Sequence, residues 1–102
     1  MLRHYETLIL VNPDLTNEEN NEIVENLKKV IEDRGGEVIT VDDWGIRELA
    51  YEVRKHTTGR YVRFEYALPP TEVSEFERRI KLNENIFKFL TVKLSDKYKK
   101  NS

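Results

Sequence analysis

Hydrophobic and polar residues alternate near the start of the chain with the period of a β-strand. In the segment HYETLILVN, the side chains of Tyr5, Thr7, Ile9 and Val11 fall on one face, and those of positions 6, 8 and 10 fall on the other. The pattern predicts a strand with apolar side chains on both faces.

After the turn NPDL, the apolar residues recur with the period of an α-helix. Thr16 and Glu19 have the spacing of a capping box, in which each side chain accepts a hydrogen bond from the other residue's backbone N–H. The glycines at 35 and 36 supply the positive φ that ends a helix. The apolar residues between these signals recur on one helical face, at Ile23, Leu27, Val30 and Ile31.

Two more strands, a second helix and a final strand are predicted in the remainder. The second strand runs from Glu37 to about Arg54 with a bulge or bend at Gly45, and a turn at residues 56–59 leads into the third. The segment PPTEVSEFERRIKL is a helix with Pro70 in its first turn. The segment NIFKFLTVKL is the fourth strand. The helix has an apolar stripe of Val73, Phe76 and Ile80.

The order strand, helix, strand, strand, helix, strand predicts an α+β fold of the ferredoxin-like βαββαβ type. Two interleaved βαβ units with right-handed crossovers give a four-stranded antiparallel sheet with both helices on one face. We expect residues 1–95 to form this single domain and the lysine-rich residues 96–102 to be a flexible tail.

The second and third strands are expected to pair as a hairpin around the turn at 56–59. Residue 55 then faces residue 60, and Glu52 pairs with Arg63 on the open sheet face. Most aromatic residues of the hairpin are therefore predicted to be core residues, not platforms for nucleic-acid bases. The apolar pairs that share the helix-covered face are Val53 with Val62, Tyr51 with Phe64, and Leu49 with Tyr66.

The tip of this hairpin carries bases that no nearby acid neutralises. Arg54, Lys55, His56 and Arg60 lie there with Tyr61 beside them, and residues 53–64 contain no acid. Such a run fits either a solvated surface or a finger that contacts phosphate groups.

The outer strands carry more apolar residues than one covered sheet face can absorb. On the fourth strand, alternation places Phe87 and Phe89 on one face and Ile86, Leu90 and Val92 on the other. An apolar patch on the open sheet face would suit a protein partner, unless terminal residues or a bulge cover it. The candidate residues for this contact are Leu8, Leu10, Phe87 and Phe89.

Composition narrows the possible functions. The chain has no cysteine, which excludes disulfides and thiolate chemistry and suits a reducing cytoplasm. No apolar run is long enough for a signal peptide or a membrane span. The formal net charge of -2 argues against a protein that coats nucleic acid by bulk electrostatics.

Enzymatic and metal-dependent functions find little support. His4 and His56 are far apart and lack any metal-ligand spacing, so no metal or other cofactor is expected. An acylphosphatase-like enzyme shares the predicted fold, but its anion-binding loop needs glycine where this chain has VNPDLT. An RNA recognition motif is the stronger alternative, because YVRF at residues 61–64 matches half of its third-strand signature. Gly59 stands where that signature needs a stacking aromatic residue.

Four segments together resemble the sixth protein of the bacterial small ribosomal subunit. They are RHYETLILVNPDL, GIRELAYEVRK, GRYVRFEYALP and NENIFKFLTVKL, and they follow the order of that family over nearly the whole chain. Val53 and the pair Phe87 and Lys88 depart from residues that are more usual there.

The resemblance implies a ribosome-associated protein without catalytic activity. It implies binding to the central domain of 16S ribosomal RNA together with the eighteenth protein of the small subunit. On that basis the expected RNA contacts are Arg3, Arg54, Lys55, His56, Arg60, Tyr61 and Lys88.

Overall fold

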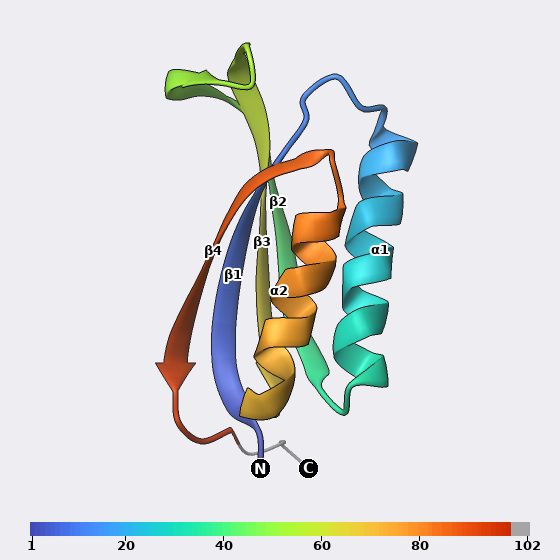
Figure 1. The fold of residues 1–102 in the computed structure, drawn as a ribbon, viewed down its shortest axis with the longest axis vertical. Coiled ribbons are helices and arrows are strands. Elements are labelled where there is room, and N and C mark those ends of the chain that lie inside the picture. Colours follow the sequence, from blue (N-terminus) through green and yellow to red (C-terminus); the bar gives the residue numbers. More distant parts are fainter. Residues whose placement is uncertain (99–102) are drawn as a thin grey trace.

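The computed structural model describes residues 1–98, so residues 99–102 of the expected tail lie outside the described part. The strands pair antiparallel in the order β2-β3-β1-β4, and both α-helices cover the same face of the sheet (Figure 1). The ferredoxin-like prediction is confirmed. The elements are β1 (Arg3–Val11), α1 (Asn17–Asp33), β2 (Glu37–Val53), β3 (His56–Leu68), the 3-10 helix η1 (Pro70–Glu72), α2 (Val73–Leu82) and β4 (Ile86–Ser95).

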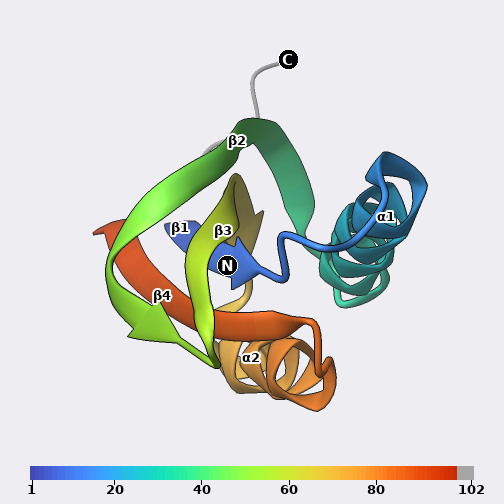
Figure 2. The same cartoon turned by 90° about the horizontal axis from the view of Figure 1, so that it is seen from above.

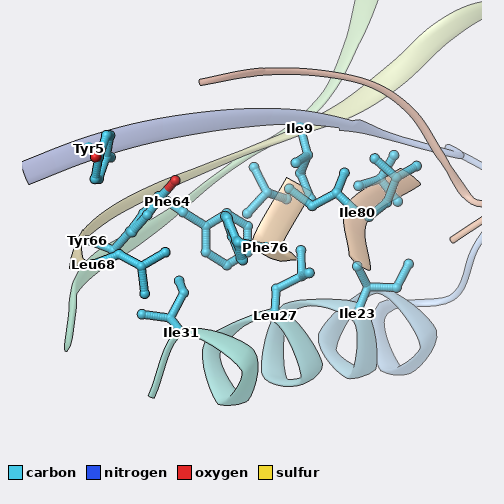
Figure 3. Packing of buried hydrophobic residues seen from close by; sticks show 13 residues of the cluster. Tyr5, Ile9, Ile23, Leu27, Ile31, Phe64, Tyr66, Leu68, Phe76 and Ile80 are labelled. Carbon is cyan, nitrogen blue, oxygen red and sulfur yellow. The ribbon is translucent and has the colours of Figure 1, made fainter. Parts of the chain in front are cut away.

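The hydrophobic core lies between the sheet and the two helices (Figure 3). Alternate residues of β1 and β3 meet the apolar stripes of α1 and α2, as the two periods predict. The rings of Tyr66 and Phe76 lie 5.0 Å apart between their centroids, at the contact between β3 and α2. The buried cluster contains Tyr5, Ile9, Val11, Ile23, Leu27, Ile31, Val62, Phe64, Tyr66, Leu68, Phe76, Ile80 and Ile86.

Helix α1 begins and ends largely as predicted. The Thr16 hydroxyl accepts a hydrogen bond from the Glu19 amide at 3.1 Å, and the Glu19 carboxylate accepts one from the Thr16 amide at 2.9 Å. Gly35 has the expected positive φ of 84°. Gly36 does not, which corrects the prediction for that position. A Cβ on Gly36 would lie 2.5 Å from the carbonyl oxygen of Ala67, so this glycine permits close contact of two backbones.

The β2–β3 turn lies nearer the N-terminus than predicted, and the predicted register is wrong. Arg54 and Lys55 form a two-residue turn with φ values of 48° and 65°, and Val53 pairs with His56. Residues 56–59, expected to form the turn, belong to β3. The sequence hid this turn because neither of its central residues is the glycine or asparagine that usually takes positive φ.

The true register changes which residues of β2 reach the core. Phe64 lies opposite Val41 and Tyr66 opposite Val38, and both valines pack against the core cluster. The pairs predicted for Leu49, Tyr51 and Val53 do not form, and these three residues lie in the distal half of the hairpin.

The bulge predicted at Gly45 is confirmed. The register shifts between Asp43 and Gly45, where Gly45 has a φ of 76°. Beyond this bulge the hairpin bends over the open face of the sheet (Figure 2). The Tyr51 hydroxyl accepts a hydrogen bond from the Lys88 ammonium at 3.1 Å, although β3 and β1 separate β2 from β4 in the sheet.

A second irregularity, in β4, corrects the predicted faces of that strand. Lys88 pairs with Leu10 but Ile86 pairs with Val11, so Phe87 is an extra residue in the ladder. Ile86 therefore shares the core face with Phe89, not with Leu90 and Val92 as alternation alone had placed it. Leu90 and Val92 are on the open face with exposed fractions of 63% and 43%.

Candidate functional site

The basic tip of the hairpin rests against the end of the sheet where β4 begins. The Arg54 guanidinium lies 5.2 Å from the centroid of the Phe87 ring and donates a hydrogen bond to the Glu84 carbonyl at 3.4 Å. Within the described residues, Lys55 is exposed and forms no ion pair.

His56 joins the same tip to the connection between β1 and α1. Its Nε2 lies 3.0 Å from a carboxylate oxygen of Asp14, and its Nδ1 lies 3.0 Å from the carbonyl oxygen of Arg54. Its ring is 5.3 Å from the Phe87 ring, between centroids. The hydrogen bond to Asp14 raises the pKa of His56 above its ordinary value. Arg54, Lys55 and His56, three of the expected RNA contacts, therefore lie together.

Arg60 does not belong to this group. Its guanidinium binds both carboxylate oxygens of Asp43 on β2 and donates to Asn17 at 2.9 Å, at the start of α1. The hydrogen bond from Arg60 holds the pKa of Asp43 below its usual range. From the sequence, only acids within residues 53–64 were considered as partners, and Asp43, which lies outside that range on β2, was therefore missed.

Three other expected RNA contacts lie elsewhere. Arg3 is at the start of β1, with Asp96 at 3.9 Å. Tyr61 and Lys88 are on the open sheet face, where the Lys88 ammonium lies 4.7 Å from the centroid of the Tyr51 ring. Arg3 and Tyr61 thus lie apart from the tip, whereas Lys88 lines a hollow together with Arg54 and Phe87.

The open sheet face carries an apolar surface along β1 and β4. Two adjoining hollows of about 170 and 110 Å³ share Leu10, Tyr61 and Lys88 in their lining. Leu8 faces Leu90 across the strand pair, and Leu10 faces Lys88. We call this surface the β1–β4 patch, and its residues are Leu8, Tyr61, Lys88, Leu90, Val92 and Leu94. Leu10, which was expected to contact a partner, is instead buried, with an exposed fraction of 3%.

Of the two phenylalanines predicted to contact a partner, Phe87 lies at the hairpin tip, whereas Phe89 also lines the hollow of Leu8 and Leu90. Phe87 is half-buried beneath Arg54 and His56 at the hairpin tip. Phe89 packs against the core, and the Lys81 ammonium lies 5.8 Å from its ring centroid. Leu90, Val92 and Leu94 were missed as candidates, although the antiparallel pairing of β4 with Leu8 on β1 was the signal that could have found them.

A polar network covers the rest of the open face. Arg63 binds Glu6 and Glu65 at 2.7 Å each and Asp42 at 3.0 Å, so the predicted pair with Glu52 does not form. These hydrogen bonds raise the pKa of Arg63, and the one from Arg63 holds the pKa of Glu65 below its usual range. The open face therefore divides into a charge-paired half and the β1–β4 patch.

The described residues contain no cluster of histidine and carboxylate side chains suited to a metal ion. Neither helix within residues 1–98 has the length and apolar character that crossing a membrane requires.

Comparison with known proteins decides the family. A family model described as Ribosomal protein S6 matches residues 4–93. The chain belongs to the ribosomal protein S6 family. The S6 family consists of structural proteins of the small ribosomal subunit, not of enzymes, which removes the acylphosphatase-like alternative.

Individual S6 proteins resemble the chain over nearly its full length. The small ribosomal subunit protein bS6 of Solidesulfovibrio magneticus is 50% identical over 97 residues, which cover 95% of each chain. That of Oleidesulfovibrio alaskensis is 47% identical over 95 residues, covering 93% of this chain and 94% of the other. The crystal structure of 30S ribosomal protein S6 from Thermotoga maritima superimposes with a TM-score of 0.86 at 29% identity, covering 91% of this chain and 88% of that one.

Proposed function

We propose that this S6 protein binds the central domain of 16S ribosomal RNA in the cytoplasm, jointly with the eighteenth protein of the small subunit. Membership of a ribosomal family supports a role in a ribonucleoprotein. The observation that carries the proposal is the placement of two surfaces. Lys55, exposed and without an ion pair among the described residues, lies at the hairpin tip, and the exposed Leu90, Val92 and Leu94 lie together on the β1–β4 patch.

The hairpin tip is suited to phosphate groups. Lys55 lies in the two-residue turn, is exposed and has no counter-ion among the described residues, and Arg54 and His56 lie beside it. Phosphate contacts of this kind position a protein on RNA without reading its sequence. Arg3 and Arg60 stay predictions as phosphate contacts, and each has a carboxylate partner that RNA would have to displace.

The β1–β4 patch is suited to a protein. Leu90, Val92 and Leu94 expose apolar area beside the half-buried Leu8, and Lys88 and Tyr61 supply polar atoms within it. Apolar residues surrounded by polar groups are typical of the centre of a protein interface.

Joint binding follows from the small charge of the chain. With a formal net charge of -2, this protein neutralises few phosphates alone, so the counter-ion release that drives RNA binding is small. A partner that holds the chain beside the RNA raises its effective concentration there and makes a few contacts sufficient.

Replacement of Lys55 tests the RNA contact. In the two-protein complex with a 16S central-domain fragment, Lys55→Ala should weaken binding and reduce the slope of log affinity against log salt by about one. Lys29→Ala removes the same charge from the outer face of α1 and should leave the slope unchanged. An equal slope for the two variants would remove Lys55 from the RNA interface.

Two leucines of equal exposure test the patch. Leu90 on β4 is 63% exposed and Leu82 at the end of α2 is 65% exposed. Leu90→Glu should lower the affinity for the partner protein at least about tenfold, as loss of a central apolar contact does, whereas Leu82→Glu should not. Equal affinities in calorimetric titrations of the two variants would place the partner elsewhere.

A further inference from the structure

The hydrogen bonds of His56 require a particular charge state of its ring. Both ring nitrogens lie 3.0 Å from oxygen atoms that can only accept, the carboxylate of Asp14 and the backbone carbonyl of Arg54. A neutral imidazole has one N–H and one lone pair, so it can donate to only one of them. The doubly protonated imidazolium donates to both. The geometry therefore fits the charged ring.

The imidazolium connects three separate segments of the chain. The hydrogen bond to Asp14 reaches the β1–α1 connection, and the ring lies against Phe87 at the start of β4. Arg54 lies over the same Phe87 ring and donates a hydrogen bond to the Glu84 carbonyl, just before β4. These contacts hold the turn that carries Lys55 in one place. We call them the tip latch.

Several charged groups surround the ring, and only one of them is an acid in direct contact. Asp14 faces Nε2 at 3.0 Å, and its side chain is otherwise exposed. Other charged residues lie close by. Arg54, Lys81 on α2 and Lys88 on β4 line one hollow with Phe87, Lys55 precedes His56 in the chain, and the Glu84 carbonyl binds Arg54.

We propose that Asp14 is a positioning residue for the RNA-binding hairpin, which it holds in place by stabilising His56 as an imidazolium. When the ring loses its proton, one of its two hydrogen bonds is lost and the tip becomes more mobile, held by the Arg54 contacts with Phe87 and Glu84. Because the pKa of His56 is raised in the folded chain, the latch is complete below the ordinary histidine pKa. The protonation-dependent part of the tip latch is lost as the pH rises through the pKa of His56 in the folded chain. The effect on RNA affinity rests on the proposed function, whereas the latch itself does not.

The latch can be measured in the free, full-length protein. NMR titration of the His56 ring should give a lower midpoint in Asp14→Asn than in the wild type, because the variant lacks the carboxylate that stabilises the imidazolium. Asp33→Asn removes the same charge at the far end of α1 and should leave the midpoint unchanged. The heteronuclear NOE of the Lys55 amide should fall above the midpoint, and it should do so at lower pH in Asp14→Asn.

Either of two NMR results would overturn the proposal. One is an equal His56 midpoint in the Asp14 and Asp33 variants, and the other is a Lys55 NOE that does not follow the protonation of His56.

Binding to the 16S fragment with the partner protein then tests whether the tip latch affects RNA affinity. Affinity should fall about threefold or more across the midpoint, and this fall should shift to lower pH in Asp14→Asn. A profile that is the same in both proteins would contradict the positioning role. Absence of RNA binding at every pH would instead contradict the proposed function.

Discussion

Tyr66 is a buried polar group whose environment makes the core sensitive to alkaline pH. Its side chain is fully buried, and its hydroxyl lies 2.8 Å from the Thr7 hydroxyl, which in turn lies 2.8 Å from that of Thr91. Burial raises the pKa of Tyr66 to about 12. The folded state thus resists ionisation, whereas the unfolded chain ionises near the ordinary tyrosine pKa of about 10.

Tyr66→Phe should therefore change how stability depends on pH. When folding raises the pKa of a group, that group stabilises the folded protein at pH values below its pKa in the unfolded chain. The stabilisation is lost as the pH rises towards the pKa of the group in the folded protein. Between about pH 10 and 12, the wild type should lose about 2 to 3 kcal/mol of unfolding free energy that Tyr66→Phe does not lose. Urea denaturation at several pH values measures this difference. Tyr51→Phe, at an exposed position, is the control, and identical curves for Tyr66→Phe and the wild type would contradict the account.

The β2–β3 hairpin combines a strained turn with the basic tip. Arg54 and Lys55 both have positive φ, a conformation that costs residues with a Cβ about 1 kcal/mol or more. Glycine takes it without that cost, which is why such turns favour it. The turn therefore keeps two charged side chains at the expense of stability.

Lys55→Gly should be more stable than Lys55→Ala but should bind RNA with the same affinity. Relief of the left-handed backbone should raise the unfolding free energy by roughly 0.5 to 1 kcal/mol relative to Lys55→Ala, which keeps the strain. Both variants lack the ammonium group, so both should weaken RNA binding to the same extent. Denaturation in urea and RNA titration measure the two effects. If Lys55→Gly were no more stable than Lys55→Ala, the turn would not be strained as described.

The same hairpin shows how far sequence could predict the elements. Periodicity and capping signals were sufficient for the order of strands and helices and for core residues such as Phe64 and Phe76. They could not give the register, because the turn contains no glycine and bulges at Gly45 and Phe87 interrupt the alternation of faces. The tip cations were found, but the pairing of Arg60 with Asp43 depends on strands brought together only by the fold.

At the scale of the whole molecule, charge and apolar surface occupy different places. Helix α1 carries the acidic surplus on the side away from the open sheet face, and Arg63 neutralises the acids of the central strands. We propose the hairpin tip as the surface for RNA and the β1–β4 patch as the surface for a protein. Because these surfaces adjoin at Lys88 and Tyr51, one partner protein and one RNA element could contact the chain together.

We propose that RNA binding by this S6 protein depends on a second protein. The decisive experiment titrates a 16S central-domain fragment with the chain alone, with the eighteenth small-subunit protein alone, and with both. We expect weak binding by either protein alone and binding at least about a hundredfold tighter by the pair, as expected when two linked contacts act together. Equal affinity of the chain for the RNA with and without the partner would contradict it.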